Sequence, residues 1–182
     1  MIYSYKNKTP RIAPGVFVAP DAWVIGDVSI GAGSGIWFGS LVRGDVHSIE
    51  IGENVNIQDH CVLHVTGGRF PLLIESNSTL AHRVTVHGCT LREHSFLGIG
   101  SIALDGSEIG EFGMLAAGSL LPPGKKIPPG KLAMGVPARV LRDITPEEEE
   151  MMRRIPEKYR ILKDEYMDPS VFSPAPSDPG GI

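Results

Sequence analysis

Aliphatic side chains recur every six residues along most of the chain. A helix repeats every 3.6 residues and a strand every two, so this longer period predicts a parallel β-helix, in which each hexapeptide supplies one short strand and one corner. Glycine often follows the aliphatic residue directly. The repeat positions form four runs, which are Ile12, Val18, Val24, Ile30, Ile36 and Val42; Ile51, Ile57 and Leu63; Ile74, Leu80 and Val86; and Leu91, Leu97, Ala103, Ile109, Leu115 and Leu121.

The period is interrupted three times, and each interruption begins at a polar residue. These residues are Arg43, His64 and His87. Regular sequence patterns tend to fail where function demands other residues, so the interruptions predict a functional site. The three irregular intervals are nine residues from Val42 to Ile51, eleven from Leu63 to Ile74 and five from Val86 to Leu91.

The repeats end after Leu121 in a segment rich in proline and glycine. Further on, Thr145-Pro146-Glu147-Glu148 predicts the start of a helix, with Thr145 as N-cap and Glu148 completing a capping box. Pro156 is expected to kink or split this helix. The apolar residues spaced for one helical face are Met151, Met152, Ile155, Tyr159 and Leu162.

The pattern therefore predicts an all-β fold with a C-terminal α-helix, divided into three segments. Residues 1–140 form the β-helix, and residues 141–167 form a helix packed along it. Residues 168–182 are rich in proline, serine and glycine, so we expect a disordered tail.

The composition agrees with this fold and indicates which partners and which cellular compartment to expect. Among 182 residues there are 22 Gly and 15 Pro, which favours many short strands joined by turns. The net charge of −4 gives no sign of a nucleic-acid or membrane partner. Two cysteines, Cys61 and Cys89, are too few for a disulfide framework, fit a reducing compartment and occupy positions suited to packing.

The N-terminus shows no segment typical of a signal peptide, and no stretch approaches the roughly 20 apolar residues of a membrane span. We expect a cytoplasmic protein, with a mature organellar form as the alternative.

Three of the six histidines follow repeat positions closely, on neighbouring hexapeptides: His64, His82 and His87. Side chains at such positions are expected to point outward from the β-helix. One isolated histidine there would be unremarkable, but three imidazoles are the ligand set of a catalytic zinc centre with an open fourth position. Fe²⁺ or Co²⁺ would suit the same ligands. The remaining histidines are expected to be solvated: His47, His60 and His94.

Other polar residues precede the histidines by about one coil, where a coil is one full turn of the β-helix. Arg43 with Asp45 could be a surface ion pair of little consequence, or part of a rigid network with Asp59 that holds the coils or a subunit contact. Gln58 could donate a hydrogen bond to a metal-bound oxygen while staying neutral.

These motifs resemble the γ-class carbonic anhydrase family over about residues 10–167. The resemblance implies a left-handed, triangular β-helix, with three hexapeptides to a coil, that assembles as a homotrimer with metal sites between subunits. His64 and His87 would come from one chain and His82 from its neighbour. Gln58 would contact the metal-bound water or bicarbonate, and the interface network would comprise Arg43, Asp45 and Asp59. The residues that carry the resemblance are Arg43-Gly44-Asp45, Gln58-Asp59, His64 and the run from His82 to Cys89.

The activity implied by the resemblance is reversible hydration of CO2 to bicarbonate by a metal-bound hydroxide at a subunit interface. The chain departs from the archetypal enzyme in its proton-transfer groups. Val46 stands where a glutamate is expected, and the loop 66–71 contains no acid. This resembles a shorter branch of the family, so any activity is expected to be low.

Three other functions stay open at this point. The same metal centre could hydrolyse a thioester. The protein could also be a non-enzymatic trimer that binds metal or serves in assembly. Acyl transfer is the least supported, because general hexapeptide acyltransferases share the repeat and lack this trio of histidines.

Overall fold

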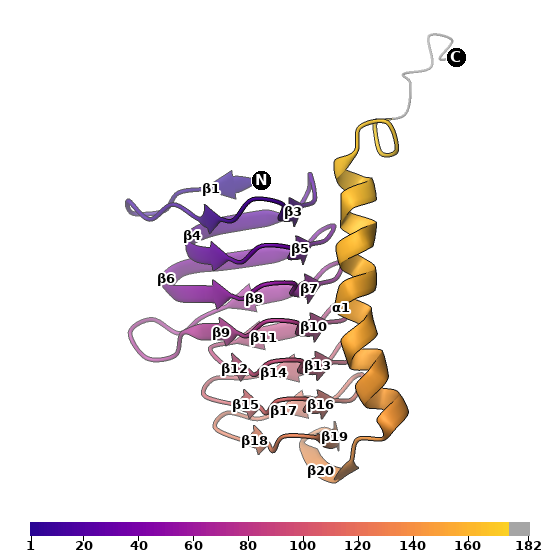
Figure 1. The fold of residues 1–182 in the computed structure, drawn as a ribbon. Coiled ribbons are helices and arrows are strands. Elements are labelled where there is room, and N and C mark those ends of the chain that lie inside the picture. The colour runs from indigo at the N-terminus through magenta and orange to yellow at the C-terminus, as the bar shows by residue number, and fades with distance from the viewer. Residues whose placement is uncertain (175–182) are drawn as a thin grey trace, which may run out of the picture.

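The computed structural model describes residues 1–174 and confirms the β-helix (Figure 1). The chain winds into left-handed coils of three short strands, and consecutive coils pair in parallel. The aliphatic repeat positions point inward and stack into one core. Leu80, Leu97 and Leu115 are examples with no exposed surface. Because every coil buries the same kind of side chain at the same place, the six-residue period produces one continuous hydrophobic core.

The strands form three faces of a prism. The first face consists of β1 (Ile2–Tyr3), the N-terminal parts of β4 (Trp23–Ile30) and β6 (Leu41–Ile51), β8 (Val62–His64), β11 (Thr85–His87), β14 (Ile102–Ala103) and β17 (Leu120–Leu121). The second face consists of β2 (Arg11–Ile12), the C-terminal parts of β4 and β6, β9 (Leu72–Ile74), β12 (Thr90–Leu91), β15 (Glu108–Ile109) and β18 (Lys126–Ile127). The third face consists of β3 (Phe17–Val18), β5 (Gly35–Ile36), β7 (Asn56–Ile57), β10 (Thr79–Leu80), β13 (Phe96–Leu97), β16 (Met114–Leu115) and β19 (Lys131–Gly135), with β20 (Ala138–Asp143) antiparallel to β19.

All three interruptions of the repeat lie at the corner between the first and second faces. Strand β6 shows how they are accommodated: its start pairs with β8 and its end pairs with β9, while the residues between follow the corner. The longest interruption projects as a loop before β9, closed by a bridge between Thr66 and Phe70 (Figure 1). The extra residues therefore leave the stacked core in register.

The C-terminal helix α1 (Pro146–Met167) begins as the sequence predicts. The Thr145 hydroxyl accepts a hydrogen bond from the Glu148 backbone N–H, and the Glu148 carboxylate accepts one from the Thr145 N–H. Of the kink or split predicted at Pro156, the split is wrong, since α1 is one continuous helix. A proline inside a helix costs about 3 kcal/mol. Pro156 is buried with Met152 in the contact with the prism, and this burial offsets part of that cost.

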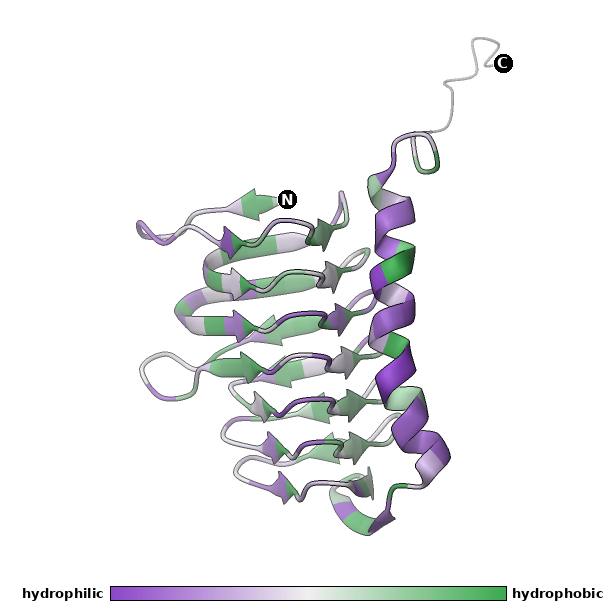
Figure 2. Cartoon of the chain, in the orientation of Figure 1, coloured by the Kyte–Doolittle hydropathy of each residue, from purple (hydrophilic) through white to green (hydrophobic). Residues whose placement is uncertain are grey.

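Helix α1 runs along the third face and covers it (Figure 1). The residues of α1 are mostly hydrophilic, with a few hydrophobic turns among them (Figure 2). Trp37 packs edge-on against Tyr159 and Tyr166, with ring centroids 5.3 and 5.2 Å apart. Such aromatic pairs contribute about 0.5–1.5 kcal/mol each beyond the area they bury, so they fasten α1 to the prism.

The tail predicted to be disordered from Asp168 falls partly outside the described residues, which end at Pro174. Within them, Phe172 packs against Tyr166 and Phe38, with centroids 4.9 and 5.9 Å apart. No helix in residues 1–174 combines the length and the apolar character needed to cross a bilayer.

The outward sides of the three faces differ in character. The second face is charged, with Arg92 bridging Glu75 and Glu108 at 2.8 and 2.9 Å. The third face lies beneath α1. The first face has no such helix over it in the part of the chain that the structure describes, although its outward side chains form one register-aligned and mainly apolar column of Trp23, Leu41, Val62, Thr85, Ile102 and Leu120.

The adjacent residues Leu72 and Leu73 test the inward and outward assignment directly. Leu72 is fully buried in the core, whereas Leu73 is half-buried on the second face. We expect Leu72→Ala to lower the free energy of unfolding by about 2–5 kcal/mol and Leu73→Ala by less than about 1 kcal/mol. Urea denaturation at equal protein concentration measures both. Equal losses would contradict the register described above.

Candidate metal centre

His64 and His87 come together at the corner between the first and second faces. They are direct register partners of the parallel strands β8 and β11, although they are 23 residues apart in the chain. His64 Nδ1 lies 3.0 Å from His87 Nε2. Two nitrogens bound to one tetrahedral ion at about 2.0–2.1 Å lie about 3.3 Å from each other. The two rings therefore lie close to the arrangement that sharing one ion requires.

A carboxylate orients each of these rings through its other nitrogen. His64 Nε2 lies 2.9 Å from Asp45 Oδ1, and His87 Nδ1 lies 2.7 Å from Asp105 Oδ1. Carboxylates that accept an N–H in this way fix the tautomer and the orientation of metal-binding imidazoles. In each ring a carboxylate holds one nitrogen, and the other nitrogen faces the second ring. These two facing nitrogens fit a metal such as zinc.

Both carboxylates are stabilised in their charged form. Burial alone would raise the pKa of Asp45, but hydrogen bonds from His64 and Arg43 outweigh it and lower that pKa. For Asp105, burial likewise acts to raise the pKa, and hydrogen bonds from His87 and Thr66 lower it below its usual value. Each carboxylate can therefore act as a hydrogen-bond acceptor at neutral pH.

His82 lies at the opposite edge of the first face. It precedes β11, whereas His87 ends that strand. Its Nδ1 is 2.9 Å from Asp59 Oδ2, and its backbone N–H donates to Gln58 Oε1 at 3.2 Å. Five residues of mainly extended chain span on the order of 10–15 Å, and the two rings face different partners, Asp59 for His82 and Asp105 for His87. Within residues 1–174 of a single chain, accordingly, no three His, Cys, Asp or Glu side chains cluster as a cation site.

The residues singled out from the sequence fall into two groups. Arg43 forms an ion pair with Asp45 beside His64 at one edge of the first face. Gln58 and Asp59 lie with His82 at the other edge. A two-histidine group and a one-histidine group thus flank the same apolar column.

Two polar residues of the first group escaped the sequence analysis. Asp105 follows the repeat position Ala103 by two residues, one coil after His87, and Thr66 donates to it from the projecting loop at 2.8 Å. Continuing the column of interrupted corners by one more coil would have found Asp105.

The other candidate residues behave mostly as packing groups. Burial raises the pKa of both Cys61 and Cys89 to about 12, so these thiols are protonated and suited to packing. His60 is exposed as expected. The expectation of a solvated His94 is wrong: its side chain is 17% exposed and stacks on Phe112 with centroids 4.6 Å apart, and burial lowers its pKa.

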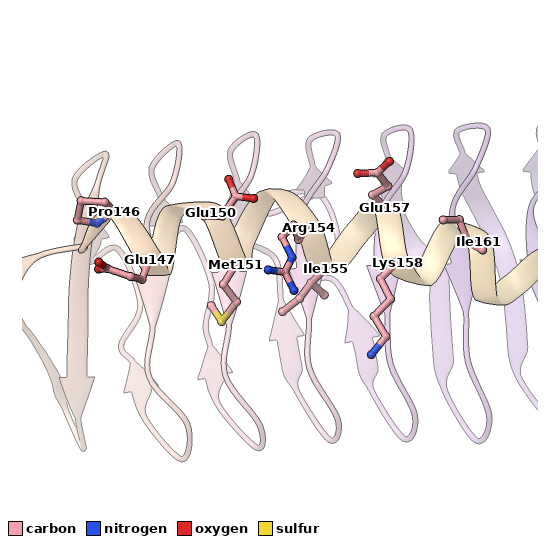
Figure 3. A pocket seen from close by; sticks show the side chains of 9 residues that line it. All are labelled: Pro146, Glu147, Glu150, Met151, Arg154, Ile155, Glu157, Lys158 and Ile161. Atoms are coloured by element: carbon pink, nitrogen blue, oxygen red, sulfur yellow. The ribbon is translucent and has the colours of Figure 1, made fainter.

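Three grooves open near α1, and the largest of them contains none of the candidate residues. That groove, of about 860 Å³, runs along α1 between apolar Met151, Ile155 and Ile161 and several charged side chains (Figure 3). A smaller groove, of about 490 Å³, contains His82 and Gln58. Its walls are mostly apolar. They include Phe96, Ile99, Met114, Leu132 and Ile155.

A scan against family models found no match for the chain. The chain is 47% identical over 166 residues to a protein from Geobacillus kaustophilus named carbonic anhydrase, covering 91% of this chain and 90% of that protein. It is 44% identical over 147 residues to γ carbonic anhydrase 2, mitochondrial, of Arabidopsis thaliana, covering 78% of this chain. The chain spans about half of that plant protein, 53% of its length.

A solved structure gives the same fold under another name. A Bacillus cereus protein described as a candidate acetyltransferase superposes with a TM-score of 0.88 at 45% identity. The match covers 91% of this chain and 95% of that one.

Gly88 tests the arrangement around His87. Its φ is +52°, and an added Cβ would collide with Asp105 Oδ1 and lie 2.7 Å from Phe70 Cβ. We expect Gly88→Ala to displace the carboxylate from His87 and to weaken metal binding by about 10-fold or more. Gly124 occupies the same corner two coils on, at φ +68° with open space around its Cα. The Gly124→Ala control therefore adds the backbone strain without the collision, and equal metal affinity of both variants would contradict the prediction. Competition with a chelator provides the measurement.

Proposed function

We propose, from the premise that the chain belongs to the γ-class carbonic anhydrase family, that it catalyses the reversible hydration of CO2 to bicarbonate at metal centres shared between copies of the chain. One observation carries this proposal. The facing nitrogens of His64 and His87 lie at one edge of the first face, and His82 lies at the other edge.

A homotrimer would bring the His82 edge of each copy against the His64 and His87 edge of another copy. If the His82 edge of each copy meets the His64 and His87 edge of the next, every contact is identical and three copies close into a ring. The apolar column of the first face then becomes buried, which contributes favourable free energy at about 25 cal/mol per Å². Trp23 and Val62, which are 38% and 40% exposed in one chain, belong to this column.

In this assembly His64 and His87 of one chain and His82 of the next would hold the metal. Zinc fits three imidazoles with an open position, and Fe²⁺ or Co²⁺ fits as well. When bound, the metal would lower the pKa of a coordinated water to about 7, which makes hydroxide available at neutral pH.

The residues of the chain orient the ligands and the substrate. Asp45, Asp59 and Asp105 each hold one imidazole through its second nitrogen. Gln58 Oε1 accepts the His82 backbone N–H, and this orients its amide NH2 as a donor to an oxygen of CO2 or bicarbonate. Arg43 holds the outer oxygen of Asp45.

Substrate binding and proton release follow from the surroundings. The mostly apolar groove beside His82 suits a small uncharged molecule such as CO2. Val46 is 50% exposed at the corner beside the loop, and neither it nor loop residues 66–71 can carry a proton. The proton released in each turnover must therefore pass to solvent or to buffer.

Acyl transfer is the second candidate, favoured by the description of the Bacillus cereus protein. Binding of acetyl-CoA, measured by calorimetry, would support it, and its absence would remove it. Thioester hydrolysis, a purely assembling role and the cytoplasmic location stay predictions from the sequence.

Metal content and CO2 hydration test the main proposal. Protein purified without oxygen should hold one metal ion per chain and hydrate CO2 in stopped-flow assays. Replacing His64, His82 or His87 with Ala should abolish both, because each removes one of three ligands. His60→Ala is the control, since His60 is exposed and outside the ligand set. Full metal content in all three ligand variants would refute the assignment.

Mixing His64→Ala with His82→Ala protein tests whether sites are shared. After random exchange of equal amounts, about three quarters of trimers are mixed, and each of these contains one complete site of three. Metal content should therefore recover to about one quarter of the wild-type value. Recovery should be absent when His64→Ala is mixed with His87→Ala, because both variants lack a ligand at the same edge.

Proton release should limit the rate. We expect wild-type hydration to be slow at low buffer and to rise with small imidazole buffers at constant ionic strength. Val46→Glu should raise kcat at low buffer, because a well-placed acid–base group contributes typically 10²–10⁴-fold. Val140→Glu adds the same charge at a comparably exposed position on β20, 47% against 50%, and should leave kcat unchanged. A fast wild-type rate that ignores buffer would contradict this account.

A further inference from the structure

The loop that interrupts the repeat after His64 is connected to the other histidine of the same group. The Thr66 hydroxyl donates to Asp105 Oδ2 at 2.8 Å. Asp105 Oδ1 in turn accepts from His87 Nδ1 at 2.7 Å. All three side chains are half-buried, so the chain of hydrogen bonds from loop to ring is partly shielded from water.

The loop is held firmly enough to place this hydroxyl. Thr66 and Phe70 exchange backbone hydrogen bonds of 3.1 and 3.2 Å, which close the loop. Phe70 packs over Gly88 and Gly106 of the next two coils, and a Cβ on Gly106 would lie 2.9 Å from the Phe70 ring. The aromatic side chain thus anchors the loop on a surface that only glycine leaves open.

Each of the two histidines of this group is oriented by a carboxylate that accepts two hydrogen bonds, one from the ring and one from a second donor. Asp45 receives one hydrogen bond from His64 and one from the cationic Arg43. Asp105 receives one from His87 and one from the neutral Thr66. In both cases the second donor fixes the rotation of the carboxylate, and the carboxylate then fixes the ring.

We propose that Thr66 is a positioning residue that acts through Asp105 to hold His87 in the tautomer with its proton on Nδ1 and with Nε2 turned toward His64. This rests on the proposed function in that the oriented Nε2 serves as a metal ligand. It also gives the interruption a role: the loop supplies a hydroxyl that fixes a ligand, in place of an acid that moves a proton.

Two substitutions separate the hydroxyl from the shape of the loop. Thr66→Val removes the hydroxyl and keeps the branched side chain, whereas Thr66→Ser keeps the hydroxyl. Zinc affinity is measured on the 182-residue chain by competition with a chelator. The His87 tautomer is measured by side-chain nitrogen NMR of metal-free protein, with the His87 signal identified from a His87→Gln sample.

We expect Thr66→Val to weaken zinc binding by about 10-fold, the lower end of the range for loss of an outer partner of a metal ligand, and to give a mixture of His87 tautomers. Thr66→Ser should stay within about twofold of the wild type in affinity and keep the wild-type tautomer. Thr90→Val, a matched substitution on the outward side of the second face, should change neither quantity.

A Thr66→Val variant with wild-type affinity and tautomer would overturn the proposal. Equal weakening by Val and Ser would also overturn it, because loop shape and not the hydroxyl would then be responsible. If the wild-type protein binds none of Zn²⁺, Fe²⁺ and Co²⁺, the proposed metal centre fails, and the tautomer measurement alone still decides the role of Thr66.

Discussion

The inward stacking of aliphatic side chains is the constraint on which the rest of the molecule depends. Once Leu63 and Val86 lie one above the other in the core, the residues that follow them must also lie one above the other. His64 and His87 are neighbours for this reason, and no contact between the two rings is needed to bring them together. The same stacking places Arg43 and Asp105 on the coils either side of them.

The fold was largely predictable because its signals are local and repeated. The six-residue period, the corner glycines and the Thr145 to Glu148 capping box each encode their structure within a few residues. The split predicted at Pro156 does not occur, and the local sequence does not contain the packing against the prism that buries Pro156 and Met152. His94 was misread for a similar reason, since Phe112, on the next coil, covers it.

The sequence marked the three histidines of the candidate site, whose role as metal ligands stays a proposal, and it marked the supporting residues less clearly. His64 and His87 can be recognised because the repeat is interrupted at them, and His82 because it lies on a neighbouring hexapeptide. Asp105 lies in a regular stretch of the chain and has no such mark. Thr66 belongs to a loop whose closure depends on Phe70 packing over Gly88 and Gly106, a contact between three different coils. The separation of the histidines onto two edges of one face follows from the coil geometry and not from their spacing alone.

The corner insertions have a consequence for how such a scaffold can diverge. Because added residues leave the prism at a vertex, a segment there can lengthen, shorten or change its chemistry without any repacking inside. Here the ends of the loop are held by rungs that pair with coils above and below. New functional groups can therefore be introduced beside His64 and His87 with little effect on the thermodynamic stability of the prism.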